Sequence, residues 1–202
     1  MKTLSAIYKL ILYSFIIIAL YTEIFANGNF RLGACAYFTI QSNMLVSFCL
    51  LLSVIWPGYY RVKYLIIGTT LLSIIITGIV YNFVLYKIFL DWGTSGYSFS
   101  RTILHVISPI GFIIGWLLFD DHGHMKWKDL FIWFAYPFVY CVGSVFAAVA
   151  MNFSIYSFFN ISAGYMSLLK WICIFLCLSS FIGLVIIFAD KNLRYDKTRS
   201  IN

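Results

Sequence analysis

The stretch YFTIQSNMLVSFCLLLSVIWPG, residues 37–58, places a long apolar run between a polar head and a Trp-Pro-Gly end. The run can cross a bilayer as a helix, which takes about 20 predominantly apolar residues. Trp56 suits the membrane interface, and Pro57-Gly58 ends the helix. The head carries four hydrogen-bonding side chains: Thr39, Gln41, Ser42 and Asn43. Because an unpaired polar group costs roughly 4–8 kcal/mol in an apolar medium, this head needs partners or a function.

The composition of the whole chain is typical of a membrane protein. Of its 202 residues, 62% are hydrophobic, 20% are aromatic and only 10% are charged. Soluble globular domains carry about 25% charged residues, which argues against that class. The net charge of +7 comes from basic residues scattered singly between apolar runs. They form no continuous face, so we expect no nucleic-acid partner.

Six apolar windows of spanning length follow one another with little chain between them. They cover residues 4–26, 36–56, 63–86, 101–119, 130–150 and 168–189. The sequence therefore predicts an all-α, polytopic membrane protein, with a six-helix transmembrane domain over residues 1–190 and a solvated tail over residues 191–202. The first window precedes a small-residue triplet, Ala34-Cys35-Ala36, at a distance too long for signal-peptide cleavage, so we expect this window to be retained.

The positions of Lys and Arg predict the orientation of these spans. In a six-span arrangement most of the 14 Lys and Arg residues fall on one side. The other side holds only Arg31, Lys87, Arg101 and Lys170. The positive-inside rule then places both termini in the cytoplasm of a multi-pass protein of the cell membrane.

The cysteines and one histidine-containing loop predict no metal site. No CxxC pair is present, and we interpret the five cysteines as small buried hydrophobic residues. They are Cys35, Cys49, Cys141, Cys173 and Cys177. In the loop FDDHGHMKWKD, His122 and His124 lie beside Asp120 and Asp121, a pattern common in solvated loops. Spaced third and fourth ligands are missing, so we predict neither a metal nor another cofactor.

Thr39 and His105 are predicted to lie at the same depth, because their windows run in the same direction. Each comes about four residues after its window begins, or about 6 Å deep at 1.5 Å per residue. Pro109 lacks the N–H that would bond the carbonyl of His105, so we expect the helix to bend there beside protein or a water-filled cavity. Other polar residues indicate one pocket below the outer surface. The candidates are Glu23, Gln41, Asn43, Tyr81, Asn82, Arg101, Ser108 and Asn152.

A hydroxyl and an imidazole at one depth favour nucleophilic acyl chemistry. Imidazole accepts a proton near neutral pH, so His105 is a candidate base for Thr39, whose oxygen would attack a carbonyl carbon. Candidates for stabilising the oxyanion are Asn43, Asn82 and Arg101, and Glu23 is a candidate for orienting the imidazole. Two alternatives stay open here: a lipid- or small-molecule-binding protein or transporter without catalysis, and a cluster that only joins helices.

Five short motifs add a resemblance that covers most of the chain. They are YFTIQSN (37–43), TGIVY (77–81), LHVISP (104–109), WLLFDDHG (116–123) and YPFVY (136–140). In order and spacing they resemble the androgen-induced-gene protein family, which includes the androgen-dependent regulator of tissue factor pathway inhibitor, and the chain looks like a bacterial-type member.

The resemblance implies an activity. Animal members of that family are six-span membrane hydrolases that cleave fatty acid esters of hydroxy fatty acids with a threonine and a histidine. By this resemblance, Thr39 is the nucleophile, His105 the base, and the substrate a lipid from the bilayer. The stretch SIYSFFNIS, residues 154–162, lacks the proline of the corresponding family stretch, so the pocket rim is expected to differ.

Overall fold

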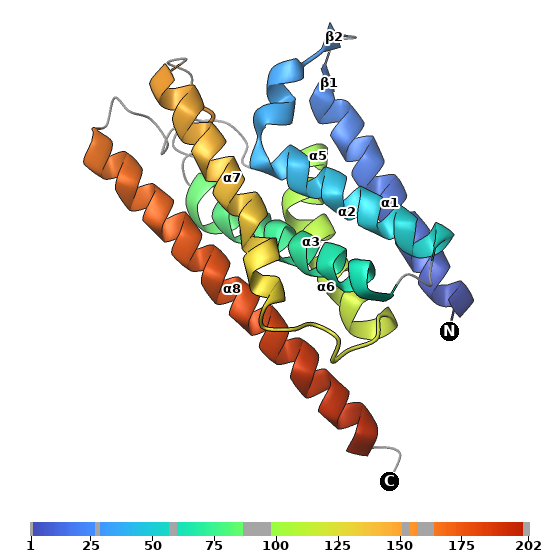
Figure 1. Cartoon of the computed structure of the whole chain (residues 1–202). Coiled ribbons are helices and arrows are strands. Elements are labelled where there is room, and N and C mark those ends of the chain that lie inside the picture. Colours follow the sequence, from blue (N-terminus) through green and yellow to red (C-terminus); the bar gives the residue numbers. More distant parts are fainter. Residues whose placement is uncertain are drawn as a thin grey trace.

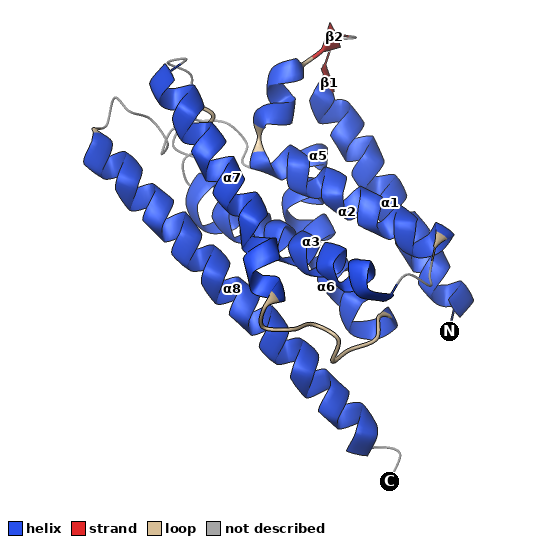
Figure 2. Cartoon of the chain, in the orientation of Figure 1, coloured by secondary structure: helices blue, strands red, loops and turns tan. Residues whose placement is uncertain are grey.

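The computed structural model describes residues 2–26, 29–56, 60–86, 98–150, 154–156 and 164–199. The α-helices are α1 (Lys2–Ile24), α2 (Phe38–Ile55), α3 (Tyr60–Val80), α5 (Phe99–Thr102), α6 (Ser108–Phe119), α7 (Asp129–Ala150) and α8 (Tyr165–Arg199). A short antiparallel hairpin, β1 (Phe25–Ala26) and β2 (Asn29–Phe30), and a 3-10 turn, η1 (Leu32–Ala36), precede α2. Two π-helical turns continue helices: η2 (Tyr81–Leu85) extends α3, and η3 (Ile103–Ile107) joins α5 to α6 (Figure 2).

Within the described residues, six helical segments are long and apolar enough to cross a membrane. They are Lys2–Ile24, Phe38–Ile55, Arg61–Leu85, Phe99–Phe119, Asp129–Ala150 and Tyr165–Arg194. The predicted number and order of apolar helices are confirmed, with ends that differ by a few residues. α2 ends at Ile55, whereas Pro57 and Gly58 lie outside the described residues. α8 runs unbroken to Arg199, so the predicted boundary after residue 190 falls inside a helix.

The long helices form one bundle with both chain ends at the same end (Figure 1). We call this the terminal end. α3 lies at the centre, in contact with α2, α6, α7 and α8. The surrounding helices expose large apolar side chains, such as Ile18, Phe131 and Phe181. Gly78 lets α3 approach α6 closely, because a Cβ there would lie 3.2 Å from the ring of Pro109. This approach brings η2 beside η3.

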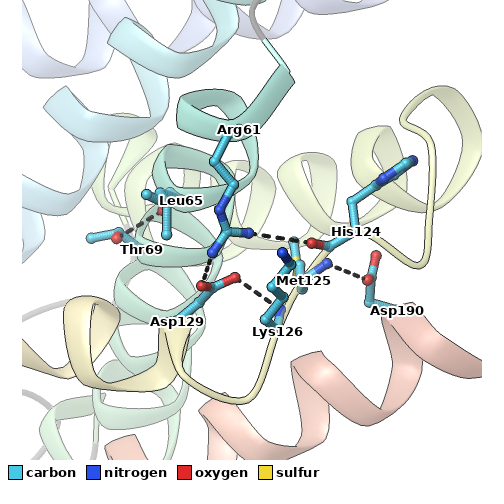
Figure 3. A network of polar contacts seen from close by, with 8 residues as sticks. All are labelled: Arg61, Leu65, Thr69, His124, Met125, Lys126, Asp129 and Asp190. Carbon is cyan, nitrogen blue, oxygen red and sulfur yellow. Dashed lines mark hydrogen bonds and ion pairs between the residues drawn. The ribbon is translucent and has the colours of Figure 1, made fainter.

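Two buried carboxylates hold the loop between α6 and α7 at the terminal end (Figure 3). Asp129 of α7 accepts hydrogen bonds from the Arg61 guanidinium of α3 and from the backbone N–H of Lys126, the latter at 2.8 Å. Asp190 of α8 accepts a hydrogen bond of 2.9 Å from the backbone N–H of Met125. Both carboxylates are fully buried. The loop is thereby joined to three helices.

The loop itself also contains a buried carboxylate, that of Asp120. Asp120 pairs with Lys9 at 3.4 Å and with Lys63 at 3.2 Å. His122 is also buried, with Nδ1 3.6 Å from a carboxylate oxygen of Asp190. The expectation of a solvated loop is therefore wrong for Asp120 and His122, because their charges and polar atoms face helix residues instead of water. Among the described residues, no three His, Cys, Asp or Glu side chains group to hold a metal ion.

The cysteines are free thiols. Cys49 and Cys141 are buried as predicted, and Cys35 is partly buried. The prediction of burial is wrong for Cys173 and Cys177, which are exposed on α8. Only one face of this peripheral helix packs against α3 and α7.

We predict that Asp120→Ala destabilises the protein strongly. It removes the carboxylate that pairs with Lys9 and Lys63, and losing one partner of a buried ion pair costs about 3–5 kcal/mol of unfolding free energy. Chemical unfolding of the purified protein in detergent measures this change. Asp121→Ala is the matched control, because Asp121 is exposed and should shift the free energy by about 0.5 kcal/mol or less. Equal losses in the two variants would contradict the role of Asp120.

Candidate active site

The first turn of α2 is fixed by a tyrosine of α7. The Phe38 N–H donates to the Tyr140 hydroxyl at 3.1 Å, and that hydroxyl donates to the Ala36 carbonyl at 3.1 Å. Tyr37, between Ala36 and Phe38, has an extended backbone and is the N-cap of α2. Backbone N–H groups at a helix start have no intrahelical acceptor, so a side chain commonly serves them. Tyr140 therefore sets the position of Thr39, the second residue of α2.

Two polar side chains of this turn join α2 to its neighbours. Gln41 donates from Nε2 to the Cys35 carbonyl at 3.0 Å and accepts at Oε1 from the Tyr136 hydroxyl of α7 at 3.0 Å. The hydroxyls of Ser42 and Thr77 of α3 are 2.7 Å apart. The predicted pocket residue Gln41 is thus directed toward α7, where it ties helices together.

Pro109 lacks the N–H that would serve two backbone carbonyls in the turn that carries His105. The Ser108 N–H bonds to the carbonyl of Ile103, five residues back, which is the π register. In this register the next carbonyl, that of Leu104, faces Pro109, which has no N–H. The His105 carbonyl, four residues before Pro109, lacks the same donor. The π-helical turn η3 thus lies just before Pro109, where we expected a bend.

Two asparagines from neighbouring elements supply the missing donors. Asn43 of α2 donates from Nδ2 to the Leu104 carbonyl at 3.0 Å, and Asn82 of η2 donates from Nδ2 to the His105 carbonyl at 3.2 Å. Each amide gives a second hydrogen bond of 2.8 Å to a carbonyl one turn back in its own helix. An amide nitrogen has two hydrogens, so both are engaged in each residue. In this arrangement, these asparagines position η3 and have no N–H left for an oxyanion.

Thr39 and His105 meet, as the depth argument predicted. Thr39 Oγ1 lies 3.2 Å from His105 Nε2, and His105 Nδ1 lies 2.9 Å from the Arg101 carbonyl. A carbonyl oxygen can only accept, so Nδ1 carries the hydrogen and the Nε2 lone pair of a neutral imidazole faces the threonine hydroxyl. Tyr81 stacks on the imidazole, with ring centroids 3.7 Å apart. Stacking and the carbonyl together fix the ring.

A pocket of about 320 Å³ opens beside this pair. Its wall combines charged, aromatic and aliphatic side chains. They are Glu23, Arg31, Ala34, Tyr37, Thr39, Ile40, Tyr81, Leu85, Arg101, Leu104, His105, Ile155 and Tyr156. A second, mostly apolar cavity of about 20 Å³ shares four of these residues, Thr39, Tyr81, Leu85 and Tyr156. Thr39 therefore lies in the partition between a larger, partly polar pocket and a small apolar cavity.

Tyr156, between α7 and α8, places a second hydroxyl at Thr39. Its hydroxyl is within hydrogen-bonding reach of the Thr39 side chain and of the Thr39 backbone N–H. Its ring lies edge-on to that of Tyr37, with centroids 5.6 Å apart. Loss of water around this hydroxyl raises the pKa of Tyr156, so it stays protonated and can donate a hydrogen bond. Tyr156 belongs to the stretch for which a different pocket rim was expected.

The other predicted site residues divide into three groups. Glu23 and Arg101 line the pocket, but the Glu23 carboxylate accepts a hydrogen bond from Ser100, and the Arg101 carbonyl orients the imidazole instead. Ser108 is fully buried and does not line the pocket. Asn152 lies outside the described residues.

Tyrosines of the site that were not predicted include Tyr136, Tyr140 and Tyr156. The first two are four residues apart in YPFVY, a spacing that places both hydroxyls on one helix face, and this signal was available. Tyr156 lies outside the helices, so no periodicity pointed to it.

The fold and the site together define a bundle of apolar helices with a partly buried Thr–His pair beside a pocket. Comparison with protein-family models, with curated proteins and with solved structures found no match to this chain. Chemically, a hydroxyl hydrogen-bonded to an imidazole whose other nitrogen is held by a carbonyl can be activated as a nucleophile.

We predict that Asn82→Ala lowers the unfolding free energy by about 1–3 kcal/mol, the cost of leaving a buried acceptor unpaired. The acceptor concerned is the His105 carbonyl. Chemical unfolding in detergent measures the change. Asn192→Ala is the control, because Asn192 is exposed on α8 and should have an effect of about 0.5 kcal/mol or less. An Asn82 variant as stable as the control would show that the carbonyl does not need this donor.

Proposed function

We propose that this protein is an intramembrane threonine hydrolase that cleaves lipid esters, with Thr39 as nucleophile and His105 as general base. The observation that carries the proposal is the 3.2 Å contact between Thr39 Oγ1 and His105 Nε2 in the wall of a pocket. This distance is at the edge of the range of about 2.6–3.2 Å that proton transfer requires. The bond from Nδ1 to the Arg101 carbonyl supports it, because it leaves the basic nitrogen facing the hydroxyl.

In this proposal the bundle crosses the cell membrane with both termini in the cytoplasm. Six apolar helices of spanning length and exposed apolar side chains such as Ile18, Phe131 and Phe181 support insertion, because such a surface is costly in water. The excess of Lys and Arg at the terminal end supports the orientation. The Thr39 pocket then lies near the outer surface and receives lipid from the bilayer.

The first half of the reaction transfers an acyl group to the enzyme. The Thr39 hydroxyl gives its proton to His105 Nε2 while Oγ1 bonds to the ester carbonyl carbon, and the carbonyl oxygen becomes an oxyanion. When the oxyanion collapses, the bond to the leaving alkoxide breaks. The imidazolium gives its proton to the alkoxide oxygen, so an alcohol leaves and the acyl group remains on Thr39.

The second half releases the acid. His105 takes a proton from water, whose oxygen bonds to the acyl carbon, and the bond to Thr39 Oγ1 breaks. The proton returns to Thr39. Each cycle consumes one ester and one water and yields one alcohol and one carboxylic acid, without a metal or other cofactor.

Pocket size and lining favour a long-chain ester as substrate. A volume of about 320 Å³ is at the lower end of the range of roughly 300–1,000 Å³ for ligand pockets, so it can hold the ester group and part of a chain. Aliphatic and aromatic walls suit the chain, and Arg31 and Arg101 suit a free carboxylate. A fatty acid ester of a hydroxy fatty acid has both features, in accordance with the family resemblance.

We predict that purified protein in detergent or nanodiscs releases fatty acid from such an ester. Thr39→Ala and His105→Ala are each expected to reduce the turnover, measured by mass spectrometry of the products, to background, because nucleophile and base act as a unit. A long-chain activated ester should leave an acyl group on Thr39, visible as a mass increase of the rapidly quenched protein.

Each substitution has a matched control outside the pocket. Thr69→Ala removes a threonine hydroxyl that bonds within α3, and His124→Ala removes an exposed imidazole at the terminal end; both should retain turnover. Undiminished turnover by Thr39→Ala or His105→Ala would reject the assignment. Saturable lipid binding without turnover by the wild type would favour the binding-protein alternative.

We assign stabilisation of the oxyanion to the Tyr156 hydroxyl, which lies beside Thr39 at the start of α2. The positive end of the helix dipole is there as well. Tyr156→Phe should lower kcat by about 10²–10³-fold with little change in KM, as for the loss of one oxyanion donor. Tyr165→Phe, which alters an exposed tyrosine of α8, is the control. A lower affinity for substrate with unchanged kcat would assign Tyr156 to binding instead.

A further inference from the structure

A second, basic pocket lies at the terminal end, remote from Thr39. It is open, has a volume of about 500 Å³, and is formed by the loop between α6 and α7 together with the last turns of α8. It is lined by Gly123, Met125, Lys126, Trp127, Lys191 and Arg194, which we call the basic pocket. Three of the six are cations and none is acidic, so the pocket carries excess positive charge.

The buried carboxylates that neighbour Lys126 and Lys191 in the folded chain are engaged elsewhere. Asp129 binds Arg61 and a backbone N–H, and Asp190 accepts from a backbone N–H of the loop (Figure 3). The ion pairs of the described residues include no carboxylate bound to Lys126 or Lys191. Their ammonium groups therefore remain available to an anion.

Backbone and aromatic groups shape the basic pocket. Gly123 has φ +84°, and a Cβ there would lie 2.1 Å from the Cδ of Arg194, so glycine lets the arginine side chain lie against the loop. The Lys191 ammonium lies 4.5 Å from the centroid of the Trp127 ring, within cation–π range. Trp127 is itself half exposed. The Lys191 ammonium thus lies against an aromatic ring, and the Arg194 side chain packs against the loop.

Apolar surface adjoins the basic pocket on the side of the bundle. Phe131, four residues after Trp127 at the start of α7, is 82% exposed, and Phe188, three residues before Lys191 on α8, is 64% exposed. A ligand that places an anionic group on the cations and hydrocarbon on these rings would satisfy both surfaces. A membrane phospholipid has this form, and Trp is the residue typical of the interface between its headgroup and chains.

We propose that the basic pocket binds the phosphate headgroup of an anionic phospholipid, with its acyl chains along Phe131 and Phe188. Pockets of Lys and Arg at the cytoplasmic end of membrane helices are suited to such headgroups. The proposal requires insertion in a membrane but is independent of ester hydrolysis, because no residue of the basic pocket lines the Thr39 pocket.

The test is native mass spectrometry of the purified full chain titrated with phosphatidylglycerol or with phosphatidylcholine. We expect tighter binding of phosphatidylglycerol. In the double variant Lys126→Gln, Lys191→Gln the Kd for this lipid should rise about fivefold for each cation, hence about 25-fold. The Kd for phosphatidylcholine should not change. Because both side chains are exposed, unfolding in detergent should match the wild type.

A control double variant removes two positive charges outside the basic pocket. Lys2 and Lys128 are exposed at the terminal end but do not line the basic pocket, so Lys2→Gln, Lys128→Gln should keep the preference for phosphatidylglycerol. Equal losses in the two double variants, or equal affinity of the wild type for the two lipids, would overturn the proposal. Binding of inorganic phosphate as tightly as phosphatidylglycerol, with the same loss in the first variant, would identify a soluble-anion site and also overturn it. Lipid binding is measured independently of turnover. A negative result here would therefore leave the hydrolase proposal unaffected.

Discussion

The missing N–H of Pro109 is the constraint on which the site depends. Pro109 cannot donate to the Leu104 carbonyl in the π register or to the His105 carbonyl in the α register, and amides from two other elements bond to these carbonyls. Satisfying these carbonyls requires α2 and η2 to approach η3 at one level. The same approach places the hydroxyl of Thr39 and the ring of Tyr81 against the imidazole. The geometry of the Thr39–His105 pair thus follows from satisfying backbone groups, so it is as rigid as the helix packing itself.

The two ends of the bundle use different polar interactions. At the terminal end, buried carboxylates bind lysines, an arginine and backbone N–H groups, and these charged ties join the loop between α6 and α7 to the helices around it. Around Thr39, neutral amides and hydroxyls make most of the contacts between helices, and the Glu23 carboxylate of α1 accepts from Ser100 of α5. Neutral hydrogen bonds cost less to desolvate than ion pairs do. Among the described residues, the imidazole is hydrogen-bonded to a hydroxyl and to a backbone carbonyl. That environment suits a base that must be neutral before it accepts a proton.

Hydropathy and proline placement predicted much of this arrangement, for identifiable reasons. The six apolar helices follow from composition over long windows, and Thr39 and His105 could be brought to one depth because rise per residue is constant. The direction in which each side chain points could not be predicted in this way. Asn43 and Asn82 were placed near the pair, but their amides donate to carbonyls, because the π register that exposes Leu104 is set by tertiary packing. Burial of Asp120 and His122 likewise depends on lysines and an aspartate far away in the chain, which loop composition does not reveal.

The Thr–His pair differs from a second hydroxyl pair in the same bundle. Ser42 and Thr77 meet at 2.7 Å and both are buried; Thr77 borders the small apolar cavity, but neither residue lines the pocket beside the imidazole. That contact has the form expected of hydrogen bonds that join helices. The Thr39 hydroxyl is only partly buried and borders a pocket on each side, while the imidazole borders the larger one. A contact that served packing alone would gain nothing from this space, because it leaves apolar and polar walls uncovered. In the proposed hydrolase, the pocket gives the pair room for an ester carbonyl, and the oriented lone pair of His105 activates the Thr39 hydroxyl to attack it.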